Sequence, residues 1–358
     1  MKPIGTPALV RTPLLAALAA CACIHLGPIT ADASAARADQ FGLAATGHLH
    51  NLDPASLARE LAGYRGAGAR WIRFDLNWGV VQAGGPRSWN WAPFDRVIRG
   101  ARARGLRVLA VLSYSPDWAR PPGTGPLHQP SNLRALTRFA RAAARRYRGL
   151  GVRHWEIWNE PNLADFWQPR PNAAAYGRLL RAAHRGIKRV DRRAVLVTGG
   201  LSPATNTGTS VAPVTFLRRL YRSRARRYFD AVGHHASTFP YLPSVRASWS
   251  AWWQMAGTRP SLRSVMLRNG DRRKRIWVTE FSAPTGGSRA VSEARQAEIL
   301  RVGYRLIGRY RWAGPLFWFS FRDGTVPGGD WQEHCGLVRA DYSAKPALGV
   351  YQALARAG

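Results

Sequence analysis

The chain has 358 residues, enough for one large domain or two ordinary ones, and 46% of them are hydrophobic, which excludes an intrinsically disordered protein. Beyond the N-terminal region no apolar run reaches the roughly 18 residues of a membrane-spanning helix, which excludes a protein with several such helices. Lysine and arginine number 53 against 20 acidic residues, a formal net charge of +33.

Almost all of the basic residues are arginines, and they are spread through stretches of helical period such as 138–148 and 218–227. We interpret most of them as solvated helix faces. The alternative is a positive field that attracts a polyanion, and an acidic glycan fits it better than a nucleic acid, because no nucleic-acid motif accompanies the charge. We therefore predict no nucleic-acid partner.

The N-terminus has the order of a targeting segment. Basic residues precede an apolar stretch from Leu14 to Leu26, and two A-x-A cleavage sites follow it. We assign 1–38 to a signal peptide and 39–358 to a single catalytic domain. Alternatively, Leu18-Ala19-Ala20-Cys21 resembles a lipobox, in which Cys21 is lipidated and retained as an anchor. In either case we expect the protein to be secreted or held on the cell surface, with no membrane span.

From residue 41 onward, short runs of β-branched and aromatic residues alternate with longer segments of helical period, the pattern of βα units. The predicted strands are 41–50, 71–78, 107–114, 154–159, 194–199, 229–235, 275–281 and 316–321. The predicted helices are 54–67, 93–104, 131–147, 172–190, 214–227, 292–310 and 344–355.

Eight such units, of about 40 residues each, predict an α/β fold, the (β/α)8 TIM barrel. A doubly wound open sheet would be expected to carry a glycine-rich phosphate turn after its first strand, and residues 46–50 do not form one. Long loops are predicted at 121–130, 202–213 and 239–260. Because barrel active sites form at the C-terminal ends of the strands, we expect these loops to wall a cleft.

Two glutamates stand at the ends of predicted strands. Glu160 lies in Trp-Asn-Glu-Pro-Asn after the fourth strand, and Glu280 lies in Thr-Glu-Phe at the end of the seventh. Either residue alone could be an ion-pair partner in a chain so rich in arginine. As a pair they are expected to face each other across the barrel mouth, an arrangement that suits glycoside cleavage. That chemistry requires neither a metal nor a cofactor, and we predict none.

The two motifs resemble those of glycoside hydrolase clan A, the retaining (β/α)8 hydrolases, and are most like the cellulase-related family 5 and the β-xylosidase-related family 39. The resemblance covers essentially all of 41–358. It implies that Glu160 is the general acid/base and Glu280 the nucleophile. It also implies that Asn159 binds the sugar 2-hydroxyl.

The same resemblance implies further site residues. Arg73 matches the strand-two arginine that supports the nucleophile, and a nearby cation would keep Glu280 ionised. His235 matches the strand-six histidine. The tyrosine that follows this histidine in the clan is replaced here by Ser237, so Tyr241 from the next loop is expected to reach the nucleophile instead.

Three tryptophans are candidate sugar platforms, because sugars stack their C–H faces on aromatic rings. Trp318 matches the platform beneath the sugar at the cleavage point. Trp78 and Trp118 follow strands two and three and are candidate subsite walls, although a core role fits each equally well.

These features together predict a secreted retaining β-glycoside hydrolase that acts on a polysaccharide or oligosaccharide by double displacement. The long loops favour an endo-acting cleft, while an exo-acting β-xylosidase or β-glucosidase type remains open, and the arginine excess hints at an acidic glycan. The alternatives are a non-hydrolytic cell-surface glycan-binding barrel and a polyanion binder. The presence of Glu160, Glu280 and Asn159 together favours the hydrolase.

Overall fold

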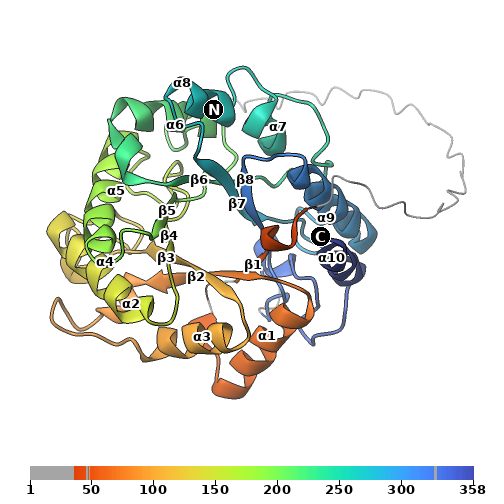
Figure 1. Cartoon of the computed structure of the whole chain (residues 1–358), viewed down its shortest axis with the longest axis horizontal. Coiled ribbons are helices and arrows are strands. Elements are labelled where there is room, and N and C mark those ends of the chain that lie inside the picture. The colour runs from red at the N-terminus through yellow and green to blue at the C-terminus, as the bar shows by residue number, and fades with distance from the viewer. Residues whose placement is uncertain (1–35, 46, 48, 326–328) are drawn as a thin grey trace, which may run out of the picture. The chain divides into compact units, whose positions relative to one another are not determined.

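Eight parallel strands close into a barrel in sequence order, with β8 pairing back to β1 (Figure 1). The computed structural model describes residues 36–45, 47, 49–325 and 329–358, which belong to one compact unit. Most of the predicted signal segment, including Cys21, lies outside the described residues. The predicted (β/α)8 barrel is confirmed.

The strands lie close to their predicted positions. They are β1 (Phe41–Ala44), β2 (Trp71–Asn77), β3 (Arg107–Ser113), β4 (His154–Ile157), β5 (Val195–Thr198), β6 (Ala231–His235), β7 (Arg275–Phe281) and β8 (Ala313–Phe319). Two ends differ from the prediction. β1 ends at Ala44 rather than at residue 50. β8 begins at Ala313 rather than at residue 316, because Gly314 and Pro315 belong to the strand although such residues usually lie outside strands.

Helices surround the barrel (Figure 1). They are α1 (Pro54–Gly66), α2 (Trp78–Val81), α3 (Ala92–Ala103), α4 (Leu133–Arg148), α5 (Ala173–Lys188), α6 (Pro213–Arg222), α7 (Ala251–Ala256), α8 (Leu262–Arg268), α9 (Glu293–Gly308) and α10 (Pro346–Ala357). Several begin at a side-chain cap, as at Asn132 and Asn172, whose Oδ1 atoms accept backbone N–H groups of the first turn. In the described part of the chain, none of the helices has the length and apolarity needed to cross a membrane.

Two helical predictions need correction. The predicted loop 239–260 contains α7, which Ser250 caps and which buries Trp252 and Met255 in the core. The predicted helix 214–227 ends at Arg222, because Arg224 adopts a left-handed conformation with φ of 60°.

Strand alternation decides which side chains face the barrel axis. Phe317 lies inside the barrel, with ring centroids 6.3 Å from Trp71 and 6.4 Å from Trp277. Trp318, the next residue along β8, belongs instead to the apolar layer between strands and helices. On β2, Arg73 and Asp75 follow Trp71 at two-residue steps and share its inward face, so both side chains enter the barrel interior.

A bulge in β7 brings Glu280 to the barrel interior. Trp277 also faces the interior, and Glu280 comes three positions after it, which in a regular strand would place the two side chains on opposite faces. The pairing of β7 with β6 and with β8 shifts register in this stretch. This irregularity re-aims Glu280 toward the barrel mouth.

Candidate active site

Arg73 stands at the centre of the site and is 4% exposed. Its Nε and Nη2 donate to the Glu156 carboxylate at 2.6 and 3.2 Å, and its Nη1 donates to Glu280 Oε1 at 2.6 Å. Nη2 also donates to Asn159 Oδ1 at 2.7 Å. Burial alone would lower the pKa of the guanidinium, but the Glu156 and Glu280 carboxylates outweigh it and raise the pKa above its usual range. Arg73 is therefore a permanent cation beside Glu280.

Glu156 is a site residue that the sequence analysis missed. It lies on β4, is fully buried, and accepts hydrogen bonds from Arg73 and from the Gly200 amide at 2.8 Å. Gly200 is required there because a Cβ would collide with the His235 imidazole. The signal was present in the sequence: a glutamate inside an otherwise apolar strand requires a buried cation, and Arg73 was already a candidate.

A strained turn after β4 presents Asn159 and Glu160. Trp158 and Glu160 both have left-handed backbones, with φ of 69° and 43°. The turn is held on both sides, because Tyr176 Oη donates to the Ile157 carbonyl at 2.7 Å and the Trp158 indole donates to the Phe166 carbonyl at 2.6 Å. Such a conformation persists only where the surroundings enforce it, so this packing fixes the direction of the Glu160 side chain.

His235 connects the two glutamates. Its Nδ1 lies 2.7 Å from Glu160 Oε1 and 3.6 Å from Glu280 Oε2, and oxygens of the two carboxylates lie within 4.8 Å of each other. Burial lowers the pKa of His235, but Glu280 and Glu160 outweigh it and the pKa is raised. The three side chains are also spaced so that they could hold a metal ion, although Arg73 and His235 already pair with the two carboxylates.

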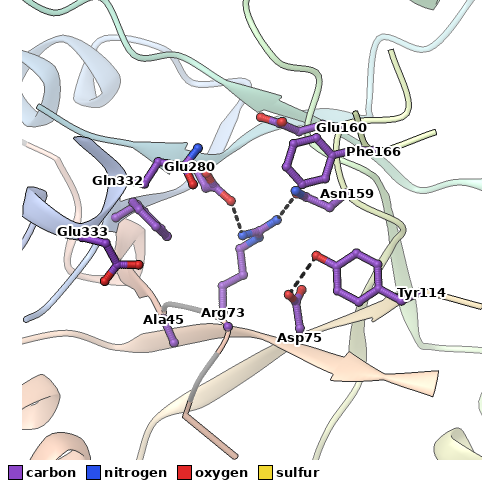
Figure 2. A pocket seen from close by; sticks show the side chains of 12 residues that line it. Ala45, Arg73, Asp75, Tyr114, Asn159, Glu160, Phe166, Glu280, Gln332 and Glu333 are labelled. Carbon is purple, nitrogen blue, oxygen red and sulfur yellow. Dashed lines mark hydrogen bonds and ion pairs between the residues drawn. The ribbon is translucent and has the colours of Figure 1, made fainter. Parts of the chain in front are cut away.

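A cavity of about 220 Å³ opens over Arg73. Figure 2 shows Arg73 between Glu280 and Asn159, with Tyr114 and Asp75 side by side on the same wall. Tyr114 Oη donates to Asp75 Oδ2 at 3.3 Å. Burial raises the pKa of Asp75 to about 6, against the opposing effect of Arg73. The sequence analysis did not assign Asp75, although its two-residue spacing from Arg73 places it on the same strand face.

Replacing Asp75 with asparagine should change the pH dependence of stability. Because the folded state binds this proton more tightly than the unfolded chain, ionisation above about pH 6 costs the folded protein free energy, whereas below about pH 4 the residue is protonated in both states. Relative to wild type, Asp75→Asn should therefore gain up to about 3 kcal/mol of unfolding free energy at pH 8 and much less at pH 4. Urea unfolding of both proteins at the two pH values measures this, and a difference independent of pH would contradict it.

A second cavity of about 380 Å³ shares Glu160 and Glu280 with the first. The two cavities also share Phe166, Phe319 and Gln332. The second extends over the loops after β4 to β8, where its further lining residues are Leu163, Asp165, Ser202, Pro203, His235, Ser237, Phe239, Ser282, Arg289 and Trp331. The predicted loops 202–213 and 239–260 thus contribute to the walls, whereas 121–130 contributes to neither cavity.

The structure brings together five of the predicted site residues. Arg73, Asn159, Glu160, His235 and Glu280 converge at the junction of the two cavities. The expected proximity of Arg73 to Glu280 is confirmed, and the catalytic and binding roles of the five residues remain predictions.

The three tryptophans are placed elsewhere. Trp318 is fully buried, packs edge-on against Phe281 and donates its indole N–H to the Cys335 carbonyl, because it stands on the outer face of β8; Phe319 lines both cavities instead. Trp78 is buried and stacked on Phe139. Trp118 is half-buried, lies edge-on against Trp78 and lines neither cavity. The predicted platform role of Trp318 is therefore wrong, and for Trp78 and Trp118 the structure favours the alternative that these residues belong to the core.

Tyr241 does not take the place of the missing tyrosine. The residue is 52% exposed and its ring lies 4.9 Å from the Trp249 ring, and within the described residues no hydrogen bond joins it to Glu280. Ser237 lines the second cavity and pairs with Ser282, whose backbone N–H donates to Ser237 Oγ at 2.9 Å. In the described part of the chain, Glu280 is therefore held by Arg73 and lies beside His235, without a hydrogen bond from a tyrosine.

Comparison with solved structures identifies the architecture. A family 39 glycoside hydrolase from Bacteroides cellulosilyticus WH2 is similar with a TM-score of 0.70 and 21% identity, over 90% of this chain and 64% of that one. A β-xylosidase from Caulobacter crescentus CB15 is similar with a TM-score of 0.64 and 17% identity, over 89% and 69% of the two chains. A GH5_18 structure from Streptomyces cattleya has a TM-score of 0.65 and 16% identity, over 90% and 80%.

Comparisons by sequence match only a small part of the chain. No family model matches the chain. The curated relatives are plant β-amylases: 27% identity over 62 residues with that of Medicago sativa, and 36% over 59 residues with that of Oryza sativa subsp. japonica. These matches span 17% and 16% of this chain and 12% and 11% of the relatives. The chain also spans just under two thirds of the family 39 structure. The resemblance to families 5 and 39 is thus confirmed at the level of the fold: this chain has the same (β/α)8 barrel architecture as these glycoside hydrolase structures.

Proposed function

We propose that this protein is a retaining β-glycoside hydrolase in which Glu160 is the general acid/base and Glu280 the nucleophile. The observation that carries the proposal is the approach of the two carboxylates to within 4.8 Å. Retaining glycosidases place their carboxyl groups about 5 Å apart so that one can attack the sugar directly, whereas inverting enzymes leave roughly 6.5–9.5 Å for a water molecule.

The surroundings of the two carboxylates suit their different roles. Glu280 Oε1 accepts a charge-assisted hydrogen bond from Arg73, which fixes the position of the carboxylate as a nucleophile requires. Glu160 meets the His235 imidazole, which orients its carboxyl group at the boundary between the two cavities. Glu160 in its protonated form is placed to serve as the acid.

In the first step, the Glu160 proton passes to the glycosidic oxygen as its bond to the anomeric carbon breaks and a Glu280 oxygen bonds to that carbon. In the second step, Glu160 takes a proton from water as the water oxygen attacks the anomeric carbon and the bond to Glu280 breaks. The sugar leaves with its original configuration because each step inverts it once.

Asn159 is placed to hold the sugar. Its Oδ1 is engaged by Arg73, while among the described residues its Nδ2 has no hydrogen-bond partner and the side chain lines the first cavity. A hydrogen bond from Nδ2 to the 2-hydroxyl would strengthen as charge develops in the transition state. Phe166 and Phe319, which line both cavities, are the aromatic surfaces available to the sugar at the cleavage point.

The substrate class is a β-linked polysaccharide or oligosaccharide. The names of similar structures support this proposal, since they include a β-xylosidase, an exo-β-1,4-mannosidase from Opitutaceae bacterium strain TAV5 and xylanase 10B from Thermotoga maritima. Action outside the cytoplasm is part of the proposal and depends on the targeting pattern in 1–38.

The test is hydrolysis of a panel of aryl β-glycosides and of neutral and acidic polysaccharides, followed by proton NMR of the first sugar released. We expect at least one substrate to be cleaved and its β-anomer to appear before mutarotation. Release of the α-anomer first would overturn the double displacement. Binding of glycans without turnover of any of them would favour a glycan-binding barrel.

A further inference from the structure

The two cavities can be assigned to the two sides of the scissile bond. The first contains Arg73 and Asn159, the groups placed next to the nucleophile and the 2-hydroxyl, so it holds the sugar that becomes attached to Glu280, the glycon. The second lies on the His235 side of Glu160. The acid must face the departing oxygen, so the second cavity holds the leaving group. This assignment rests on the proposed function.

The glycon cavity is acidic although the chain is strongly basic. Its charged lining residues in the described part of the chain are Asp75, Glu160, Glu280 and Glu333 against Arg73 alone. The Arg73 guanidinium is already engaged by Glu156, Glu280 and Asn159. No described cation in this cavity is thus available for a carboxylate of the substrate, and a uronic acid there would meet several like charges.

The leaving-group cavity differs, because Arg289 stands on its wall. The guanidinium lies over two aromatic rings, 5.0 Å from the Phe239 centroid and 5.4 Å from the Trp331 centroid, and those rings are 5.1 Å apart. Within the described residues no carboxylate pairs with it. Asp165 lines the same cavity from the loop after β4 and forms no ion pair with Arg289. Arg289 therefore offers an unpaired cation beside an aromatic wall.

We propose that the cleft selects a substrate with a neutral glycon and a leaving group that carries a carboxylate, which Arg289 binds while Phe239 and Trp331 contact its apolar face. A β-glycosidic bond from a neutral sugar to an acidic sugar meets this description. The net charge of +33 would draw such an acidic glycan to the surface, while the acidic first cavity excludes its uronic acid units from the glycon position. Charge thus sets which bonds of a mixed glycan are cleaved.

The test uses 4-carboxyphenyl and 4-carbamoylphenyl β-glycosides of whichever of xylose, glucose, galactose or mannose the enzyme hydrolyses. The two aglycones have nearly the same shape and differ in charge. We expect wild type to favour the carboxylate in kcat/KM, and Arg289→Gln to lower that preference about five- to tenfold, mainly through KM. Arg289→Lys should retain part of it, and added salt should weaken it in wild type.

Arg141→Gln is the matched control. Arg141 is an exposed arginine on α4 that lines neither cavity, so its substitution removes the same charge at a distance from the site. If Arg289→Gln changes both substrates equally, the leaving-group assignment is overturned while the proposed function stands. If wild type hydrolyses neither substrate with any of the four sugars, the proposed function itself fails. Cleavage of an aryl β-glucuronide as fast as the matching β-glucoside would overturn the neutral-glycon assignment.

Discussion

Glu280→Ala is expected to lower kcat on every substrate by about 10⁴-fold or more, because the proposed mechanism forms its glycosyl-enzyme bond on the Glu280 carboxylate. Release of the aryl group, followed by absorbance, measures the loss. Added azide should restore part of the activity, since a small anion can enter the space vacated by the carboxylate and attack the anomeric carbon from the same side. The product should then be an α-glycosyl azide.

Folding must be separated from chemistry in this variant. Removing Glu280 leaves one side of the buried Arg73 guanidinium without its carboxylate, which is expected to cost about 1–3 kcal/mol of stability. Glu280→Gln keeps an acceptor for Arg73 while removing the nucleophile, so it should fold like wild type and remain inactive. Substantial activity in a well-folded Glu280→Gln protein would refute the assignment of the nucleophile.

Glu160→Ala is expected to lower kcat/KM by a factor that depends on the leaving group of the substrate. Substrates with poor leaving groups, such as natural oligosaccharides, need the proton and should lose about 10²–10⁴-fold in kcat/KM. An activated aryl glycoside, such as a dinitrophenyl glycoside, departs without protonation, so its first step should be nearly unaffected. Accumulation of the glycosyl-enzyme should follow, because Glu160 is also the base of the second step.

Steady-state kinetics and intact-mass measurement check this prediction together. The variant should show a burst of aryl release and a mass increase equal to one sugar. Glu333→Gln is the control, since it changes a carboxylate in the same cavity that makes no contact with the reacting groups in the proposed mechanism. Equal losses on good and poor leaving groups would show that Glu160 is not the acid.

Local sequence patterns accounted for the fold and for the most important site residues. The alternation of strand and helix segments predicted the barrel. The spacing of hydrophobic residues shows which face of each segment is buried, and this does not depend on the exact packing of the side chains. Glu160 and Glu280 were predicted from their positions at the ends of apolar strands and from the motifs around them, and Arg73 was implied by the resemblance to clan A. The predicted contact between Arg73 and Glu280 is present at 2.6 Å.

Residues whose role depends on orientation could not be predicted in the same way. Trp318 and Phe319 are adjacent and both aromatic, and only the alternation observed in β8 shows that Phe319 faces the cavities while Trp318 packs beneath the helices. Tyr241 was expected to reach Glu280 from its loop, but a loop's path depends on contacts with distant segments. In this case the ring packs on Trp249.

The sequence by itself determined the eight-fold repeat of strand and helix and the positions of Glu160 and Glu280 at strand ends, because each of these is encoded by residues close together in the chain. Only the tertiary structure decided that the register shift in β7 turns Glu280 inward and that Glu156 completes the ion pairs of Arg73. It also decided that acidic groups line the first cavity while Arg289 stands on the wall of the second. The physical reason is that these features depend on strand register and loop packing, which bring together residues from different βα units.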